Sequence, residues 1–377
     1  MFELAIFSSI LFFSWIPYFI INIVWFFLII SEIVRNRNWK NYYIIIIIIM
    51  SPVISFFSIG SNKELLFNIS LIIGVFLFYA VGINTYNLEI WNKRIKFIVI
   101  LCFGIVLYYE IGAVMIDPAT FFGDRRGFWA KEYLLFGRPY EFSLGVTHLN
   151  LYLNFILAVS MGKYIDEKKG VYIWLFLLSV VLGLLTQSRS PILFVIILIL
   201  LVLIKRLIIN SNLKYFLYFA FTLACITLMF INIVSSASED GGNGGGRLAS
   251  GALMDASRLF FYMKGIEHLI QAPLGNNLLD SDESMPLKSY HNAFLSSGNR
   301  LSVFFFALFL IVTFFFFIRN LFQKENSINR YTNLFLLYYC LHNFMLEDII
   351  QMDRFVFLFF FYLMGYLQSE KLNVKVV

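Results

Sequence analysis

Two arginines and one histidine are of the types that could bind a phosphate group and move a proton. Arg189 stands between two long apolar runs, Arg258 opens an amphipathic segment, and His291 precedes another apolar run. A guanidinium group can hold two phosphate oxygens at once, and an imidazole can orient an attacking hydroxyl or take its proton near neutral pH. These three residues are the first candidates for a site, provided that the fold brings them together.

Each arginine also has a simpler alternative role. Arg258 falls in the first turn of a predicted helix over 255–271, where a cation opposes the helix dipole unless an anion is bound beside it. The alternative is an ion pair with Asp255 or contact with a lipid headgroup. Arg189 lies at a membrane edge if its segment is a tight turn, and within the membrane if residues 171–204 form one broken passage. Here the alternative is a snorkelling anchor.

Other polar residues flank the same apolar runs. Asn292 follows His291 directly, and His148 and Asn150 open the run near 142–161. We consider Asn292, His148 and Asn150 as substrate-binding candidates. A histidine in such a place could equally make structural hydrogen bonds alone, so both readings stay open for His291 and His148.

A loop over 117–141 holds three more arginines, Arg125, Arg126 and Arg138. Its basic residues are matched in number by its acidic residues, so the loop carries no net charge. Diffuse attraction of an anion is therefore excluded, and these arginines could bind phosphate only by specific pairing.

The chain shows little sign of a metal site. Asp280, Asp282 and Glu283 form an acidic group that could hold Mg²⁺ or Ca²⁺, or could be a solvated loop face. No histidine and cysteine cluster has the spacing of a zinc site. We expect neither a resident metal nor a cofactor.

The elements around these residues are predicted to be transmembrane helices. Of the 377 residues, 60% are hydrophobic and 14% are charged, and the apolar residues gather in blocks of about 17–25, enough to cross a bilayer. The sequence predicts an all-α polytopic membrane protein of about 11–12 spans, with residues 1–377 forming one integral membrane domain. We expect spans near residues 4–30, 42–59, 65–86, 97–116, 142–161, 171–187, 191–204, 213–234, 301–318, 331–346 and 355–368.

The positions of the basic residues predict the orientation. Short connections hold 17 of the 29 lysines and arginines, and such loops stay in the cytoplasm. The longer loops 117–141 and 235–300 then lie on the other side of the membrane. The net charge of +6 implies contact with lipid headgroups, and we expect no nucleic-acid partner.

The loop over 235–300 is the most informative. Its glycine run over 241–246 lacks the Gly-Lys-Ser/Thr ending of a phosphate-binding loop and is typical of a flexible hinge or lid. The amphipathic helix over 255–271 follows and should stop at Pro273 and Gly275. We expect this helix to lie on or between the spans.

Three segments, read in order, resemble the O-antigen ligase and polymerase superfamily. Thr186-Gln187-Ser188-Arg189-Ser190 is similar to the family's Ser-Arg at a span edge. Ser257-Arg258, leading through Ile270-Gln271-Ala272-Pro273-Leu274-Gly275, is similar to its arginine-led helix in the large external loop. His291-Asn292-Ala293-Phe294-Leu295 is similar to its His-Asn before the next span. The family usually continues with paired glycines, where this chain has Ser302 and Phe305.

The resemblance implies a GT-C-like membrane glycosyltransferase in the bacterial inner membrane, with its site facing the periplasm. Arg189 and Arg258 would bind the diphosphate of an undecaprenyl-diphosphate-linked oligosaccharide, and His291 would orient or activate the acceptor hydroxyl. The expected partners are this lipid-linked glycan, membrane lipids, a chain-length regulator and a flippase.

Three functions remain open on the sequence. A polymerase of lipid-linked repeat units for O-antigen or capsule is our first hypothesis, because the chain has no large extra domain for another acceptor. A ligase of the same superfamily is the nearest alternative, since only the acceptor differs. A flippase is the alternative from another class, and it should carry charges within its spans along a central path.

Overall fold

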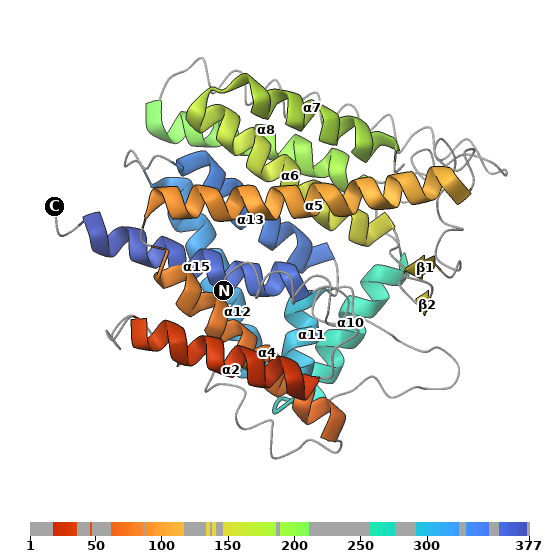
Figure 1. The fold of residues 1–377 in the computed structure, drawn as a ribbon. Coiled ribbons are helices and arrows are strands. Elements are labelled where there is room, and N and C mark those ends of the chain that lie inside the picture. Colours follow the sequence, from red (N-terminus) through yellow and green to blue (C-terminus); the bar gives the residue numbers. More distant parts are fainter. Residues whose placement is uncertain are drawn as a thin grey trace. The chain divides into compact units, whose positions relative to one another are not determined.

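The computed structural model describes residues 18–35, 46, 62–85, 87–116, 133–135, 138–140, 146–185, 189–210, 256–275, 292–323, 329–346 and 354–374. Within these ranges the chain forms eleven helices and one short two-stranded hairpin (Figure 1). The helices are α2 Tyr18–Arg35, α4 Asn62–Ile83, α5 Leu88–Ile116, α6 Val146–Glu167, α7 Gly170–Leu185, α8 Arg189–Asn210, α10 Ala256–Gln271, α11 Ala293–Leu301, α12 Val303–Phe322, α13 Arg330–Leu346 and α15 Arg354–Val374.

The chain divides into two compact units, which we describe separately. The first unit comprises Met1–Ile98, Asp255–Phe317 and Cys340–Val377, and the second comprises Val99–Met254 and Ile318–Tyr339. The candidate residues are therefore divided as well: Arg258 belongs to the first unit and Arg189 to the second.

In the first unit, α4 packs closely between α2 and α15. A methyl group added at Gly82 would collide with the carbonyl oxygen of Tyr362, and one added at Gly365 would collide with that of Tyr79. Small residues at these two positions let the helix backbones approach, as is common between helices in membranes. Trp91, at the start of α5, stacks on Tyr366 of α15 with ring centroids 3.8 Å apart.

A cluster of aromatic rings holds α11, α12, α13 and α15 together in the same unit. The ring of Phe309 lies 4.8 Å from that of Phe294, 4.9 Å from that of Phe344 and 5.3 Å from that of Phe357, measured between centroids. Each such pair contributes about 0.5–1.5 kcal/mol beyond the burial of its area. The cluster packs α11 against α12, α13 and α15.

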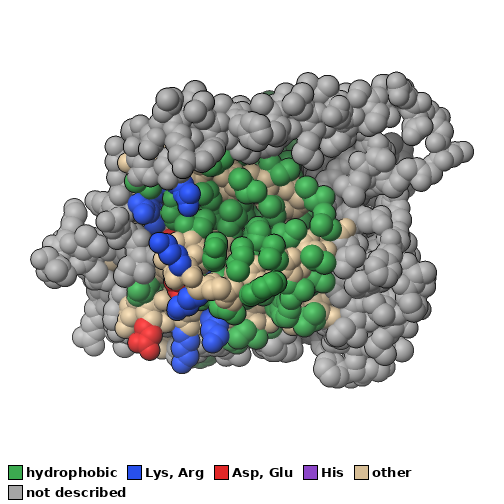
Figure 2. Space-filling model, turned by 90° about the horizontal axis from the view of Figure 1, so that it is seen from above, with side chains coloured by type: hydrophobic (Ala, Val, Ile, Leu, Met, Phe, Trp, Pro, Cys, Tyr) green, Lys and Arg blue, Asp and Glu red, His purple; other side chains and the backbone are tan. Residues whose placement is uncertain are grey.

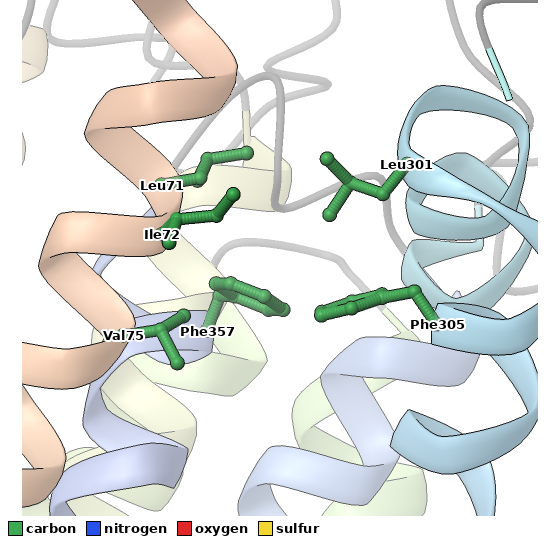
Figure 3. A pocket seen from close by; sticks show the side chains of 6 residues that line it. All are labelled: Leu71, Ile72, Val75, Leu301, Phe305 and Phe357. Carbon is green, nitrogen blue, oxygen red and sulfur yellow. The ribbon is translucent and has the colours of Figure 1, made fainter. Parts of the chain in front are cut away.

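One small cavity lies in this unit (Figure 3). Its volume is about 10 Å³, room for a single water-sized group. All of its lining side chains are apolar: Leu71, Ile72, Val75, Leu301, Phe305 and Phe357. We interpret it as a packing void, because it has neither the size nor the polar groups of a substrate site.

In the second unit, α6, α7 and α8 form an up-down-up arrangement. A methyl group at Gly183, near the end of α7, would lie 2.9 Å from Cβ of Pro191 in α8. Residues eight apart in one straight helix would be about 12 Å apart, so the chain folds back between α7 and α8. Helices α7 and α8 therefore lie side by side at this point, and the connection over 186–188 lies outside the described residues.

Two of the helices are long and apolar enough to cross a membrane. They are the segments Ser190–Ile209 of α8 and Val303–Phe322 of α12, among the residues that the structure describes. Of each segment's most apolar window, 28% is buried, whereas the core helix of a soluble protein would be mostly buried. Several shorter helices are also apolar, over 69–83, 170–184 and 355–369.

Apolar side chains face outward on these helices. On α7 the exposed residues recur at helical spacing, as they also do on α12. Figure 2 shows one face of the molecule with a broad apolar surface, and the lysines and arginines gather along one edge of it. This distribution suits contact with lipid rather than water. The exposed apolar residues of α7 are Val171, Trp174, Leu177, Leu178, Val181 and Leu184.

The structure differs from the sequence predictions in three places. Helix α5 begins at Leu88 rather than near 97, since Asn87 caps it by accepting a hydrogen bond from the backbone N–H of Glu89 at 2.8 Å. Residues 293–301 form a helix where we expected loop. Residues 133–135 and 138–140 pair as a short antiparallel hairpin where we expected loop, and the predicted all-helical fold is otherwise confirmed. The predicted span over 213–234 lies outside the described residues, as does nearly all of 42–59.

Candidate functional site

Helix α10 runs over Ala256–Gln271 and ends as predicted. The backbone at Gly275 has a positive φ of 88°, which favours glycine. A methyl group there would also lie 2.8 Å from the carbonyl oxygen of Leu301. The backbone N–H of Val303 donates to the carbonyl of Pro273 at 2.8 Å. The Pro273–Gly275 turn therefore fixes the end of α10 to the junction of α11 and α12.

One face of α10 packs against the protein. The hydroxyl of Tyr262 donates to the carbonyl oxygen of Met345 at 2.8 Å, Gly265 accepts from Asn299 at 2.9 Å, and the side chain of Leu269 is buried. Position 258 precedes these residues by 4, 7 and 11 positions in the same helix, and such spacings fall on one helix face. The register places position 258 on the packed face of α10.

The neighbouring face of α10 is an exposed apolar stripe. Met263, Ile266 and Ile270 are 64%, 50% and 74% exposed, and Leu274 continues the stripe. The remaining face is polar, where Lys264 pairs with Glu267 at 2.9 Å. This ion pair holds the pKa of the Glu267 carboxyl below its ordinary value. An apolar stripe beside a charged face is typical of a helix lying at a membrane surface.

Helix α11 is short and almost entirely buried. It lies beside α10 (Figure 1), and Asn299 joins the two by donating to the carbonyl oxygen of Gly265. Asn292 caps the helix, since its side-chain oxygen accepts from the backbone N–H of Leu295 at 3.0 Å. The structure thus gives Asn292 a capping role, and its contact with substrate stays a prediction. His291, directly before the cap, lies outside the described residues.

Ser302 and Phe305, which stand where the resemblance leads one to expect paired glycines, lie at the junction of α11 and α12. Ser302 has an extended backbone with φ of 166°, and its hydroxyl accepts from the backbone N–H of Phe305 at 3.1 Å. Ser302 therefore ends α11 and begins α12, which serine does well at a helix start. Phe305 is buried against Phe309.

In the second unit, Arg189 is the first residue of α8. The next residue, Ser190, accepts at Oγ from Nδ2 of Asn154 in α6 at 3.3 Å. Asn154 lies eight residues into α6 and Ser190 one residue into α8. The first turns of α6 therefore extend past the N-terminus of α8.

Asn150 lies one turn before Asn154 on the same face of α6, so it lies beyond the first turn of α8. Its side chain is buried. His148 lies in the first turn of α6, and its side chain is outside the described part. A helix N-terminus carries free N–H groups and partial positive charge, and a basic first residue adds to it. The segment of α6 with Asn150 thus lies beside an electropositive helix end.

The opposite end of the second unit carries a network of ion pairs and hydrogen bonds. Lys163 donates to Glu167 at 2.7 Å and to Asn329 at 2.9 Å. Asp166 accepts from the backbone N–H groups of Tyr331 and Thr332 at the start of α13. Burial raises the pKa of the Asp166 carboxyl, although its hydrogen bonds with Thr332 and Tyr331 oppose the shift.

Lys205 closes the same end of this unit. Its ammonium group donates to the carbonyl oxygens of Leu321 and Gln323 at 3.0 and 2.9 Å, and also to that of Asn320. These carbonyls belong to the last turn of α12 and the residues after it, where a cation is favoured. The C-terminal ends of α6, α8 and α12 therefore meet in the second unit.

The predicted site residues are thus placed only in part. Arg189, His148 and Asn150 lie on two adjoining helices of one unit, and Arg258 and Asn292 lie on adjoining helices of the other. Arg138 lies in the hairpin strand Arg138–Tyr140. Arg125, Arg126 and His291 lie outside the described residues. The meeting of Arg189, Arg258 and His291 at one site therefore stays a prediction.

Sequence reasoning missed Asn154. Its signal was the Asn150–Asn154 spacing of one helical turn in an otherwise apolar run.

Within the described residues, no three histidine, cysteine, aspartate or glutamate side chains gather as metal ligands. Comparison with family models, with curated proteins and with solved structures gives no match. The resemblance carried by the three sequence segments stays a prediction.

Proposed function

We propose that this chain is a polytopic inner-membrane glycosyltransferase that polymerises lipid-linked oligosaccharide repeat units. The observation that carries the proposal is the placement of Arg189 at the N-terminus of α8, beside the face of α6 that bears Asn150 and Asn154. A helix N-terminus with an arginine suits a diphosphate. The buried amide of Asn154 holds Ser190, the next residue of the same helix end.

The proposed reaction transfers a growing glycan from undecaprenyl diphosphate to a new lipid-linked unit. The acceptor hydroxyl oxygen forms a bond to the anomeric carbon of the donor sugar, and the bond from that carbon to the diphosphate oxygen breaks. Undecaprenyl diphosphate leaves with the bonding electrons, and His291 takes the proton of the hydroxyl. Arg189 and Arg258 stabilise the negative charge that develops on the leaving diphosphate.

The direction of the helices supports a site on the outer side of the membrane. The network of Lys163, Asp166 and Lys205 joins connections that the positive-inside rule assigns to the cytoplasm. Arg189 begins α8 at the other end of that helix, about 24 Å from Lys205 along its axis. The proposed donor site then faces the periplasm, where lipid-linked units arrive after translocation.

The apolar stripe of α10 supports a lipid-linked substrate. A helix that lies at the membrane surface places position 258 at the depth of lipid phosphates. In this arrangement the polyprenyl chain stays in the bilayer and the glycan remains in water.

A ligase remains the nearest alternative, because the donor and the chemistry are the same. The surface glycan of a deletion strain distinguishes the two functions. Single capped repeat units are expected if a polymerase is lost. Absent surface glycan with long lipid-linked chains accumulating would instead indicate a ligase.

A flippase is the alternative from another class. Purified protein in proteoliposomes, given a synthetic lipid-diphosphate repeat unit and no ATP, separates the two classes. We expect new glycosidic bonds, detected as longer lipid-linked chains by mass spectrometry. Movement of the lipid between leaflets without chain growth would contradict the proposed function.

A further inference from the structure

Asn154 is a fully buried polar side chain whose hydrogen bonds are incomplete. Its Nδ2 donates to Ser190, while its Oδ1 has no hydrogen-bond partner within the described structure. A buried acceptor without a donor destabilises a fold, and an apolar residue of similar size would avoid this. Asn333 shares this feature, so burial alone assigns no role to Asn154, and its place in the fold decides.

The place of Asn154 suggests that role. Ser190 follows Arg189 in the first turn of α8, so an anchor on Ser190 fixes the direction in which α8 starts. The contact of α8 with α7 adds a second restraint, because Pro191 packs against Gly183. The N-terminal turn of α8 is thus held on two sides, by α6 through Asn154 and by α7 through Gly183.

We infer that Asn154 is a positioning residue of the proposed diphosphate site: it anchors Ser190 and so sets the place of Arg189 at the start of α8. This inference rests on the proposed function. A displacement of about 1 Å at such a site lowers the rate about 100-fold. The loss should appear in kcat and in diphosphate binding, because Arg189 is proposed to bind the diphosphate.

The chain offers a matched control in Asn333. This residue lies in α13 of the same unit, is buried, and also has an Oδ1 without a hydrogen-bond partner among the described residues. It follows Asn329 and the Lys163 network, so it lies away from the start of α8. Asn154→Leu and Asn333→Leu therefore make the same chemical change at two ends of one unit.

The test measures undecaprenyl diphosphate binding in nanodiscs, chain growth and thermal unfolding for both variants. Asn154→Leu should bind the lipid diphosphate at least 10-fold more weakly and lower kcat about 100-fold, with its unfolding temperature unchanged or raised. Asn333→Leu should keep both binding and kcat. Equal binding and kcat in the two variants would overturn the inference.

Ser190→Ala keeps the test decisive if Asn154→Leu fails to fold. It removes the same hydrogen bond from the other side, so it should weaken lipid-diphosphate binding by a similar factor, and wild-type binding in this variant would overturn the inference. Wild-type protein that binds the lipid diphosphate without chain growth would contradict the proposed function alone. Wild-type protein that does not bind it would overturn both.

Discussion

The ammonium nitrogen of Lys163, near the end of α6, lies 2.9 Å from Oδ1 of Asn329, which precedes α13. These residues come from two connections that the sequence assigns to the same side of the membrane from their basic residues alone. Their hydrogen bond shows that the two connections meet. At this point the structure agrees with the rule that short basic loops lie on the same side of the membrane.

The predicted orientation can be measured by cysteine labelling. Cysteine at Lys169 and cysteine at Lys264 would each be introduced into a chain whose three native cysteines are replaced by serine. Lys169 lies in the connection between α6 and α7 and its side chain is 66% exposed, and Lys264 lies on the polar face of α10. An impermeant maleimide should label K264C in intact spheroplasts and K169C only after the membrane is opened. Labelling of both from one side would refute the orientation.

The ion pair of Glu167 predicts a dependence of stability on pH. Burial tends to raise the pKa of the Glu167 carboxyl, but hydrogen bonds from Lys163 and Lys169 outweigh it, so this pKa lies below the ordinary value of 4.5. A carboxyl whose pKa is lowered by folding stabilises the protein above its unfolded pKa. This stabilisation is lost as the pH falls through the folded pKa.

Glu167→Gln should therefore lower the free energy of unfolding at pH 7 by about 1–3 kcal/mol, because the buried ammonium group of Lys163 loses its ion pair at 2.7 Å. The difference from wild type should shrink as the pH falls below 4.5. Denaturant unfolding in detergent at pH 7 and at several acidic pH values measures it. A difference that stays constant, or grows toward acid, would show that the ion pair does not act as described.

The backbone conformation of Gly275 and its close contact with α11 predict that no other residue is tolerated at this position. Gly275→Ala should lower the free energy of unfolding by about 1–3 kcal/mol, because its φ is positive and the carbonyl oxygen of Leu301 occupies the space of a side chain. Gly104→Ala is the control, since nothing lies within 4 Å of a methyl group there, inside α5. It should raise stability by about 0.5–1 kcal/mol. Equal effects of the two substitutions would contradict the described turn.

Much of the fold could be predicted from the sequence. The bounds of α10 and α13 were predicted to within one residue, because Pro273 and Gly275 stop one helix and long apolar runs define the other. The start of α5 was missed because Lys93, Arg94 and Lys96 were taken for a loop, although they continue a helix that Asn87 caps. Helix α11 was missed because its serines and asparagine look like loop residues, and tertiary burial keeps them helical.

The candidate site was less predictable. The types of Arg189 and Arg258 indicated phosphate binding, and their helices were foreseen. The anchor of Asn154 on Ser190 joins residues 36 positions apart, and no local pattern encodes such a pairing. Asn292 was predicted to bind substrate from its place beside His291, whereas the structure uses its side chain to cap α11.

The most direct test of the account is chain growth from an undecaprenyl-diphosphate-linked repeat unit by purified protein, compared among wild type, Arg189→Ala, Arg258→Ala and His291→Ala. Each variant should insert into the membrane as wild type does and lose polymer formation. Loss of either arginine should raise the barrier by about 2–4 kcal/mol, a rate decrease of about 30-fold to 1,000-fold. Rates within a few-fold of wild type in all three variants would contradict the proposal that these residues form one glycosyltransferase site.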